Sequence, residues 1–230
     1  MIISHKHKFI FIKTKKTAGT SIEIALSKFC GESDVITTIS PKDEQVRSQF
    51  GYRGPQNHLI PFWKYSPRDW VRFVRKRKRR FLYPHSGARD ICKVVGDEVW
   101  NTYFRFCFER NPWDKAISLY FWRHKSEPRP PISEFIQSGK ANLVGGPGGF
   151  DLYSVDGEIV VDRVCLYENL EQEIEYIANR LNLPEIPQLP RAKSEFRKDK
   201  RHYRAILSEE DRIKISRVFA REIAYFGYMF

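Results

Sequence analysis

The sequence predicts an α/β protein with a central, mostly parallel β-sheet and helices packed against it. Three short apolar runs carry this prediction, because each is followed by a segment with helical spacing of its apolar residues. The runs are FIFI at 9–12, YFRFCF at 103–108 and DRVCLY at 162–167. Short, continuously apolar runs are typical of parallel strands that are buried on both faces.

The first strand is expected at 9–12, and a helix should begin almost directly after it. The apolar positions from Ile22 to Phe29 fall on one helical face, and Gly31 is a plausible stop signal. Residues 31–70 show no sustained period, so we expect loops with short elements there.

Two helices are expected around the second strand. Ser86 is the expected cap of a helix that ends at Gly96, and Asn111 is the expected cap of a helix with Pro112 at its first position. In this interpretation His85 lies just ahead of a helix N-terminus.

The last third of the chain is expected to contain a loop, a hairpin, a strand and two helices. The glycine-rich segment at 139–149 predicts a mobile loop, and Asp156-Gly157 is a strong two-residue hairpin signal. A helix should follow the strand at 162–167, and a final helix should open at Ser208.

Composition favours a single domain spanning residues 1–230, since 41% hydrophobic residues can bury a sizeable core. Lysine and arginine exceed the acidic residues by 40 to 28, and the formal net charge of +12 favours an anionic partner. Four scattered cysteines without metal-ligand spacing indicate free thiols in a reducing compartment. The N-terminal apolar stretch is too short for a signal peptide or a membrane span, so a soluble cytoplasmic protein is expected.

A strongly basic run, RFVRKRKRR, occupies residues 72–80. Such a run can contact a polyanion or serve as a localisation signal, and a solvated basic face explains it equally well.

The segment KTAGTS at 16–21 lies between the first strand and the first helix, where α/β proteins commonly bind anions. Backbone amides at the start of a helix can point at a phosphate, and the hydroxyls of Thr20 and Ser21 add donors. A Walker loop has its lysine after the glycines, whereas here Lys16 precedes Gly19. Taken alone, the segment fits an anion site or a basic surface turn.

A second segment, FCFERNPWDKAISLYF at 106–121, favours the anion site over the basic surface turn. Together with KTAGTS it resembles the sulfotransferases that use 3′-phosphoadenosine-5′-phosphosulfate (PAPS), especially the branch containing carbohydrate sulfotransferases. The segments LYENL at 166–170 and FAREIAYFGYMF at 219–230 also look like later blocks of that family. The resemblance covers most of the chain and is weakest at 31–80.

The resemblance implies a nucleotide-kinase-like, P-loop type of three-layer sandwich that binds PAPS without a metal. By this resemblance, Arg110 and Ser118 bind the 3′-phosphate. The residues expected to bind the 5′-phosphosulfate are Lys16, Thr17, Ala18, Gly19, Thr20 and Ser21. The basic loop at 189–204 would close over the nucleotide through Lys193, Ser194 and Arg197, although a solvated loop is equally credible.

Two catalytic roles are implied as well. Lys16 would stabilise charge on the oxygen that leaves with the nucleotide. His85 resembles the histidine block of the family and is the expected base, a role that its near-neutral ordinary pKa suits. The chain departs from the family at Lys15, where proline is usual, and at Glu109, where an apolar residue is usual. The Lys15-Lys16 doublet leaves open whether Lys15 shares the role of Lys16.

The expected activity is in-line transfer of the sulfuryl group from PAPS to a hydroxyl of a carbohydrate or similar polar acceptor. One alternative is a kinase-like P-loop enzyme, which should need magnesium and ATP. Another is a basic nucleic-acid-binding protein that uses residues 72–80, although no nucleic-acid motif supports it.

Overall fold

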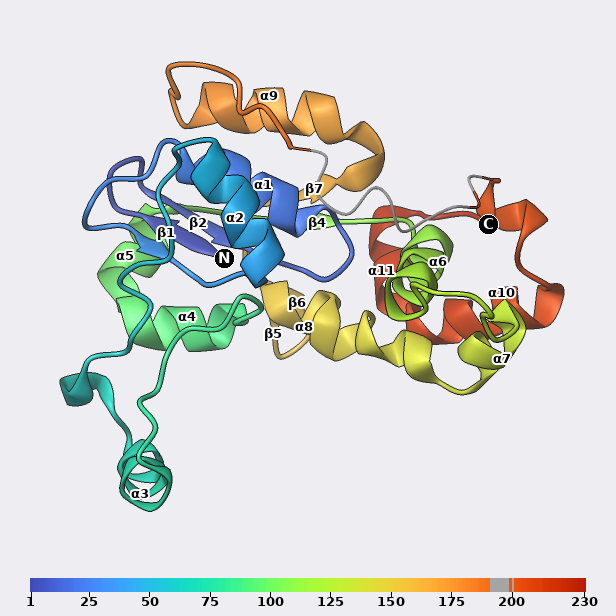
Figure 1. The fold of residues 1–230 in the computed structure, drawn as a ribbon, viewed down its shortest axis with the longest axis horizontal. Coiled ribbons are helices and arrows are strands. Elements are labelled where there is room, and N and C mark those ends of the chain that lie inside the picture. The colour runs from blue at the N-terminus through green and yellow to red at the C-terminus, as the bar shows by residue number, and fades with distance from the viewer. Residues whose placement is uncertain (191–198, 200) are drawn as a thin grey trace.

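The computed structural model describes residues 1–190, 199 and 201–230. Its centre is a five-stranded sheet with the strand order β3-β1-β2-β4-β7 (Figure 1). The strands are β1 (Ile2–Ser4), β2 (Phe9–Ile12), β3 (Val35–Ile36), β4 (Phe104–Glu109) and β7 (Arg163–Leu166). The three predicted strands are confirmed as β2, β4 and β7.

The sheet is mixed. β2 pairs with β4 and β4 pairs with β7 in parallel, whereas β1 pairs antiparallel with both of its neighbours. Four of the five strands therefore run in one direction, and the predicted α/β class is confirmed. β1 was not predicted, because three residues are too few to show a periodic pattern.

One face of the sheet is covered by α1 (Gly19–Ser27) and α9 (Leu170–Arg180). Alternate residues of β2 and β4 point to opposite faces, and all the phenylalanines of these strands point to the face that α1 and α9 cover. They form a buried cluster with residues of both helices, namely Phe9, Phe11, Phe106, Phe108, Ile22, Leu26, Ile174 and Ile177. The predicted helices after β2 and β7 are thus confirmed.

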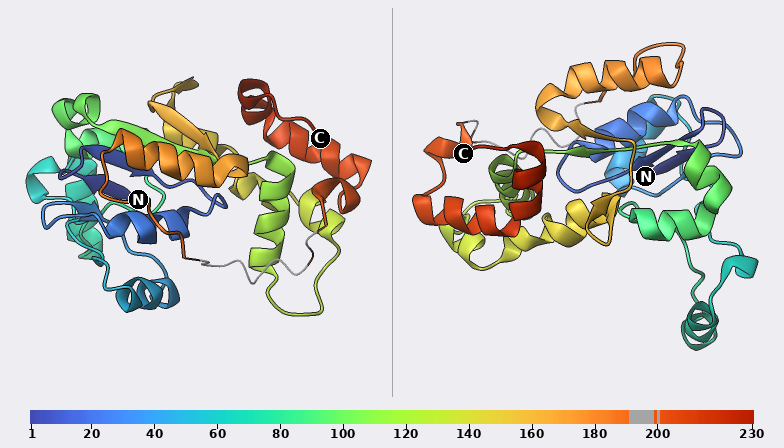
Figure 2. Two further views of the ribbon diagram at one scale, coloured as in Figure 1. Left: turned by 90° about the horizontal axis from the view of Figure 1, so that it is seen from above. Right: turned by 180° about the vertical axis from the view of Figure 1, so that it is seen from behind.

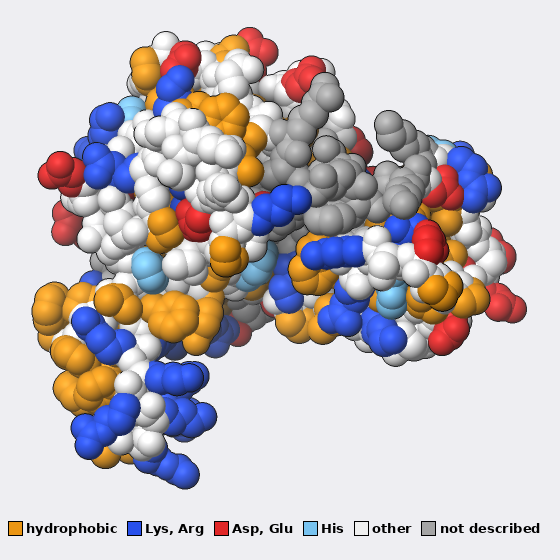
Figure 3. All heavy atoms as spheres, in the orientation of Figure 1, with side chains coloured by type: hydrophobic (Ala, Val, Ile, Leu, Met, Phe, Trp, Pro, Cys, Tyr) orange, Lys and Arg blue, Asp and Glu red, His pale blue; other side chains and the backbone are white. Residues whose placement is uncertain are grey.

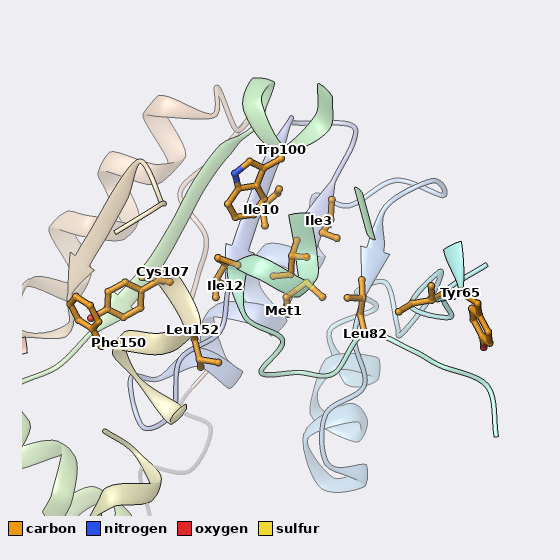
Figure 4. Packing of buried hydrophobic residues seen from close by; sticks show 14 residues of the cluster. Met1, Ile3, Ile10, Ile12, Tyr65, Leu82, Trp100, Cys107, Phe150 and Leu152 are labelled. Carbon is orange, nitrogen blue, oxygen red and sulfur yellow. The ribbon is translucent and has the colours of Figure 1, made fainter. Parts of the chain in front are cut away.

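The opposite face is covered by α4 (Ala88–Val95), α5 (Asp97–Thr102) and α8 (Phe150–Tyr153). These elements pack on the smaller side chains of β1, β2 and β4 (Figure 4). The core residues on this face include Ile3, Ile10, Ile12, Cys107, Ile91, Trp100 and Leu152. Helices on both faces give three layers.

A second group of helices lies beyond the end of β4, beside the sheet (Figure 2). It consists of α6 (Pro112–Arg123), α7 (Ile132–Gln137), α10 (Glu209–Val218) and α11 (Ala220–Phe226). These helices share a core of their own, centred on Ile117, Phe135, Ile215 and Phe219. Asn111 caps α6 by accepting from the amides of Trp113 and Asp114, as predicted.

The remaining elements are short. They are α2 (Pro41–Gln49), α3 (Pro67–Lys76), the hairpin of β5 (Ser154–Val155) and β6 (Glu158–Ile159), and the 3₁₀ turns η1 (Phe62–Lys64), η2 (Lys140–Leu143), η3 (Gly146–Gly148), η4 (Tyr167–Asn169) and η5 (Tyr203–Ala205). The hairpin turns at Asp156-Gly157, as predicted, and both residues have a positive φ.

Residues 31–70 contain more helix than expected. α2 has nine residues and α3 begins at Pro67, and each helix has a serine cap, Ser40 or Ser66, followed by proline. α2 was missed because its sequence PKDEQVRSQ has almost no apolar residues. Its contact with the body is ionic, through Arg47, whose guanidinium lies 3.5 Å from the buried carboxylate of Glu23.

The prediction that Ser86 caps a helix is wrong. Gly87 is the N-cap of α4, because the hydroxyl of Ser86 already accepts a hydrogen bond from the amide of Tyr83, 2.9 Å away. The predicted C-terminal helix begins after Ser208 but is divided into α10 and α11 at Phe219, whose side chain is fully buried.

The glycine-rich segment at 139–149 contains the 3₁₀ turns η2 and η3 and leads into α8, where the sequence predicted a mobile loop. Its glycines permit close packing, since a Cβ atom on Gly148 would lie 2.2 Å from the carbonyl oxygen of Leu143.

The four cysteines are free thiols, as predicted, with three buried and Cys92 half-buried. Within residues 1–190, 199 and 201–230, no helix combines the length and apolar character needed to cross a membrane.

Candidate anion-binding site

The candidate site lies where β2 and β4 end. The loop from Lys13 to Ala18 follows β2, and Arg110 follows β4. Because these strands are parallel neighbours, with Ile12 opposite Cys107, their carboxyl ends meet at the same edge of the sheet. The two segments of the family resemblance are therefore brought together, although they are far apart in the sequence.

The loop has an unusual backbone. Lys16 has a φ of 65° and Ala18 a φ of 58°, and left-handed conformations at non-glycine residues are uncommon and tend to cluster at functional sites. Gly19 is required by packing, since a Cβ atom there would lie 2.8 Å from Cγ of Lys13. The N-cap of α1 is Ala18, whose side chain makes no capping hydrogen bond, and the positive end of the helix dipole suits an anion at this first turn.

The start of the loop is held by buried polar contacts. Nζ of Lys13 lies 2.7 Å from the carboxylate of Glu23, which has no exposed surface. The hydroxyl of Thr14 donates to the carbonyl oxygen of Phe108 in β4 and lies 2.9 Å from the hydroxyl of Thr17. These contacts fix the loop to α1 and to the adjacent strand.

Arg110 connects the two segments directly. Its Nη1 donates to the carbonyl oxygen of Lys16 at 3.2 Å, and its Nε donates to Asp114 at 2.8 Å. The guanidinium carbon lies 4.0 Å from the ring centroid of Tyr167, and the residue is only 9% exposed. Arg110 is thus oriented by a carboxylate and an aromatic ring beside the loop.

Ser118 lies on the same side of α6 as Asp114 and Trp122, because residues four apart on a helix are neighbours. Nζ of Lys16 lies 5.4 Å from the ring centroid of Trp122, so the Lys16 side chain extends along this side of α6. The expected phosphate contacts Arg110 and Ser118 and the expected catalytic Lys16 therefore border one region.

The two lysines of the doublet point to different neighbours. Nζ of Lys15 donates to the carbonyl oxygen of Leu143 at 3.2 Å, whereas Lys16 extends toward Trp122. Burial lowers the pKa of Lys15, and the nearby positive charges of Arg123 and Lys115 lower it further. The amide of Lys15 also donates to the carbonyl oxygen of Gly148, 3.0 Å away. Lys15 thus ties the loop to the glycine-rich segment.

His85 lies beside the start of the same loop. Its Nδ1 lies 2.7 Å from the carbonyl oxygen of Lys13. A carbonyl can only accept, so Nδ1 carries the proton in this hydrogen bond, and Nε2 of the neutral ring keeps its lone pair. Burial lowers the pKa of His85 to about 4, which keeps the imidazole neutral at pH 7. The ring thus has the protonation state and the tautomer that a base requires.

Glu109 is part of the core and does not face the loop. Its carboxylate pairs with Nζ of Lys115, and both side chains have no exposed surface. It also accepts from the hydroxyl of Tyr153 at 3.1 Å and from the amide of Arg110 at 2.9 Å. A buried ion pair therefore explains why a charged residue stands at this position before Arg110.

The predicted contacts Lys193, Ser194 and Arg197 lie outside the described residues. The sequence did not indicate Tyr167 or Trp122, which pack against Arg110 and Lys16. Trp122 could have been found from its spacing, since it lies four residues after Ser118 on the same helix. Tyr167 offered only its position directly after β7, at the same edge of the sheet.

Comparisons with known proteins give a relative without an assigned activity. No protein-family model and no solved structure matches the chain. An uncharacterized protein of Archaeoglobus fulgidus is 33% identical over 94 residues, which are 40% of this chain and 78% of the archaeal protein. The chain therefore belongs to the same family as that archaeal protein.

Proposed function

We propose that this protein is a PAPS-dependent sulfotransferase that transfers a sulfuryl group to a hydroxyl of a carbohydrate or similar polar acceptor. The observation that carries the proposal is the hydrogen bond from Arg110 to the carbonyl oxygen of Lys16. These residues stand 94 positions apart and belong to the two segments that the family resemblance pairs. If residues 16–21 formed only a basic surface turn, unrelated in function to the segment before α6, this contact would not be expected.

The residues at the site suit the charges of PAPS. The first turn of α1, Lys16 and the hydroxyls of Thr20 and Ser21 would hold the 5′-phosphosulfate. Arg110 and Ser118, on the neighbouring segment, would hold the 3′-phosphate. The strand-loop-helix unit of β2 and α1 beside parallel β4 supports a fold like that of the nucleotide kinases. The four free cysteines favour a cytoplasmic setting for the enzyme.

PAPS supplies an activated sulfuryl group, and the protein would align it and balance its charge. Lys16 would stabilise the negative charge that develops on the leaving oxygen. His85 would accept the proton of the acceptor hydroxyl at Nε2, with the ring held by the hydrogen bond from Nδ1 to Lys13. Negative charge bound nearby raises the pKa of an imidazole, which would strengthen this base when the site is filled.

Calorimetric titration with 3′-phosphoadenosine-5′-phosphate, the product nucleotide, tests the proposal. We expect binding without magnesium, and weaker binding of ATP and of a nonspecific oligonucleotide. The matched variants are Arg110→Ala and Arg212→Ala, which remove equal charge at the site and on α10. A preference for magnesium and ATP would indicate a kinase-like enzyme instead. A preference for the oligonucleotide would indicate a nucleic-acid-binding protein.

A further inference from the structure

Residues 62–80 form an arm that projects from the body and consists of η1, α3 and the basic segment after it (Figure 1). Its base is firmly built. The hydroxyl of the buried Tyr65 accepts a hydrogen bond from the amide of Arg80 at 2.6 Å, and the Arg80 side chain pairs with Asp69 at 2.8 Å. Ser66 and Asp69 form a capping box at the start of α3. The arm is therefore a defined element of the fold.

One side of α3 is apolar and faces solvent. Trp70, Val71 and Val74 fall on one helical face and are 43%, 57% and 65% exposed. Trp63 in η1 is 84% exposed, and Phe62 stacks on Trp70 with ring centroids 5.5 Å apart. Monomeric soluble proteins rarely gather several large apolar side chains on one exposed element unless that surface binds something.

The other side of α3 is basic. Arg72 and Lys76 lie on the opposite helical face, Arg68 and Arg75 lie between that face and Val71, and all four are exposed. The chain continues directly into three more exposed cations, Arg77, Lys78 and Arg79. Figure 3 shows hydrophobic side chains and Lys or Arg side chains gathered on different sides of this projection.

The two faces together identify the kind of partner. A nucleic acid or another polyanion would use the basic face and leave the exposed tryptophans and valines without a role. A short amphipathic helix with tryptophan on one side and arginine and lysine on the other fits the interface of an anionic bilayer. With ten residues, α3 is too short to cross a membrane and would lie on its surface.

We propose that the arm binds the surface of membranes that contain anionic lipids. Trp63, Trp70, Val71 and Val74 would enter the boundary between headgroups and acyl chains. The cations of α3 and of residues 77–79 would contact the lipid phosphates. This binding is independent of the proposed sulfuryl transfer, because no residue of the arm belongs to the candidate anion-binding site.

The test uses the full chain with vesicles of phosphatidylcholine, alone or mixed with phosphatidylglycerol, in a sedimentation assay. We expect binding to the mixed vesicles that weakens with added salt, and little binding to phosphatidylcholine alone. The double variant Val71→Ser and Val74→Ser should reduce partitioning about tenfold or more, since it removes buried apolar area. The matched control Ile186→Ser changes an aliphatic residue that is 44% exposed elsewhere and should have no effect.

A second measurement needs no variant. Lipids brominated on their acyl chains quench tryptophans that enter the bilayer, and Trp63 and Trp70 are two exposed tryptophans on the arm. Quenching by brominated phosphatidylglycerol vesicles supports the proposal. The proposal is overturned by absent quenching, or by equal binding of the serine double variant. It is also overturned if an oligonucleotide binds more tightly than the vesicles and the double variant leaves that binding unchanged.

Discussion

His85 and Lys13 are joined by a hydrogen bond of 2.7 Å between Nδ1 of the imidazole and the backbone carbonyl oxygen. The proposed base is thereby attached to the first residue of the loop that carries Lys16. Movement of one would disturb the other, and the geometry of the proposed transfer depends on both.

Replacement of Lys16 by alanine should lower kcat for sulfuryl transfer by about 10²–10³, because the leaving oxygen loses its cation. The fold should remain, since the carbonyl oxygen that Arg110 contacts is part of the backbone. A transfer assay with PAPS and a thermal melt measure the two effects. Lys15→Ala is the matched control and should retain most activity, because its Nζ contacts Leu143. Equal loss in both variants would contradict a special role for Lys16.

Arg110→Ala should weaken binding of 3′-phosphoadenosine-5′-phosphate by about ten- to a hundredfold, because a charge-assisted contact to phosphate is lost. Binding of AMP, which has no 3′-phosphate, should change much less. Calorimetry with both ligands gives the comparison. A similar loss for both nucleotides would show that Arg110 acts through the loop at the Lys16 carbonyl instead of through the 3′-phosphate.

His85→Ala should reduce kcat by about 10²–10⁴ and leave the affinity for 3′-phosphoadenosine-5′-phosphate at pH 7 nearly unchanged. The neutral imidazole contributes no charge to nucleotide binding, so the effect should be confined to the chemical step. Steady-state kinetics and calorimetry on the same preparation separate the two. Near-normal turnover in this variant would assign His85 a purely structural role.

The pH dependence of folding gives an independent test of the His85 environment. Burial lowers the pKa from 6.5 to about 4, so between these values the unfolded chain binds a proton that the folded chain does not. Stability should therefore fall as the pH falls through this window. His85→Gln should remove about 3 kcal/mol of that loss, measured by urea titration at pH 7 and pH 4. Identical pH profiles for both proteins would refute the lowered pKa.

Glu23→Ala should destabilise the protein by about 3–5 kcal/mol, because it leaves Lys13 and the amino group of Met1 as buried cations without their carboxylate. Denaturant unfolding measures the loss. The comparison variant is Glu209→Ala, whose exposed carboxylate pairs with Arg212 on α10 and whose loss should change the stability very little, because water screens the pair. Similar losses in the two variants would show that the ion pair of Lys13 with Glu23 does not hold the loop.

The elements that could be predicted are those whose own residues specify them. β2, β4 and β7 are continuous apolar runs, and α6 has a cap and a first-position proline in its sequence. α2 could not be predicted from periodicity, because its main tie to the body is the ion pair of Arg47 with Glu23, a contact between distant residues. The glycines at 139–149 predicted a loop, but the sequence does not indicate the close contact of Gly148 with Leu143 and Lys15, because Lys15 is distant in the sequence and Leu143 belongs to another turn, η2.

The candidate site, like the fold, could be predicted only in part. Lys16 and Arg110 lie close together because the chain reaches them from the carboxyl ends of β2 and β4, which are parallel neighbours in the sheet. The place of His85 does not follow from any periodic pattern, because an irregular connection leads from the arm to α4. The family resemblance alone indicated it. The ring contacts of Tyr167 and Trp122 depend on side-chain directions that the sequence pattern does not specify.

The loop at 13–18 is fastened at successive residues, to Glu23, Phe108, Gly148 and Arg110. A receptor segment that is already rigid gives up little conformational entropy when its ligand arrives. More of the electrostatic attraction is then retained as affinity. Encounter with an anionic nucleotide would be governed by diffusion in the field of a positively charged protein, without a slow folding step of this loop.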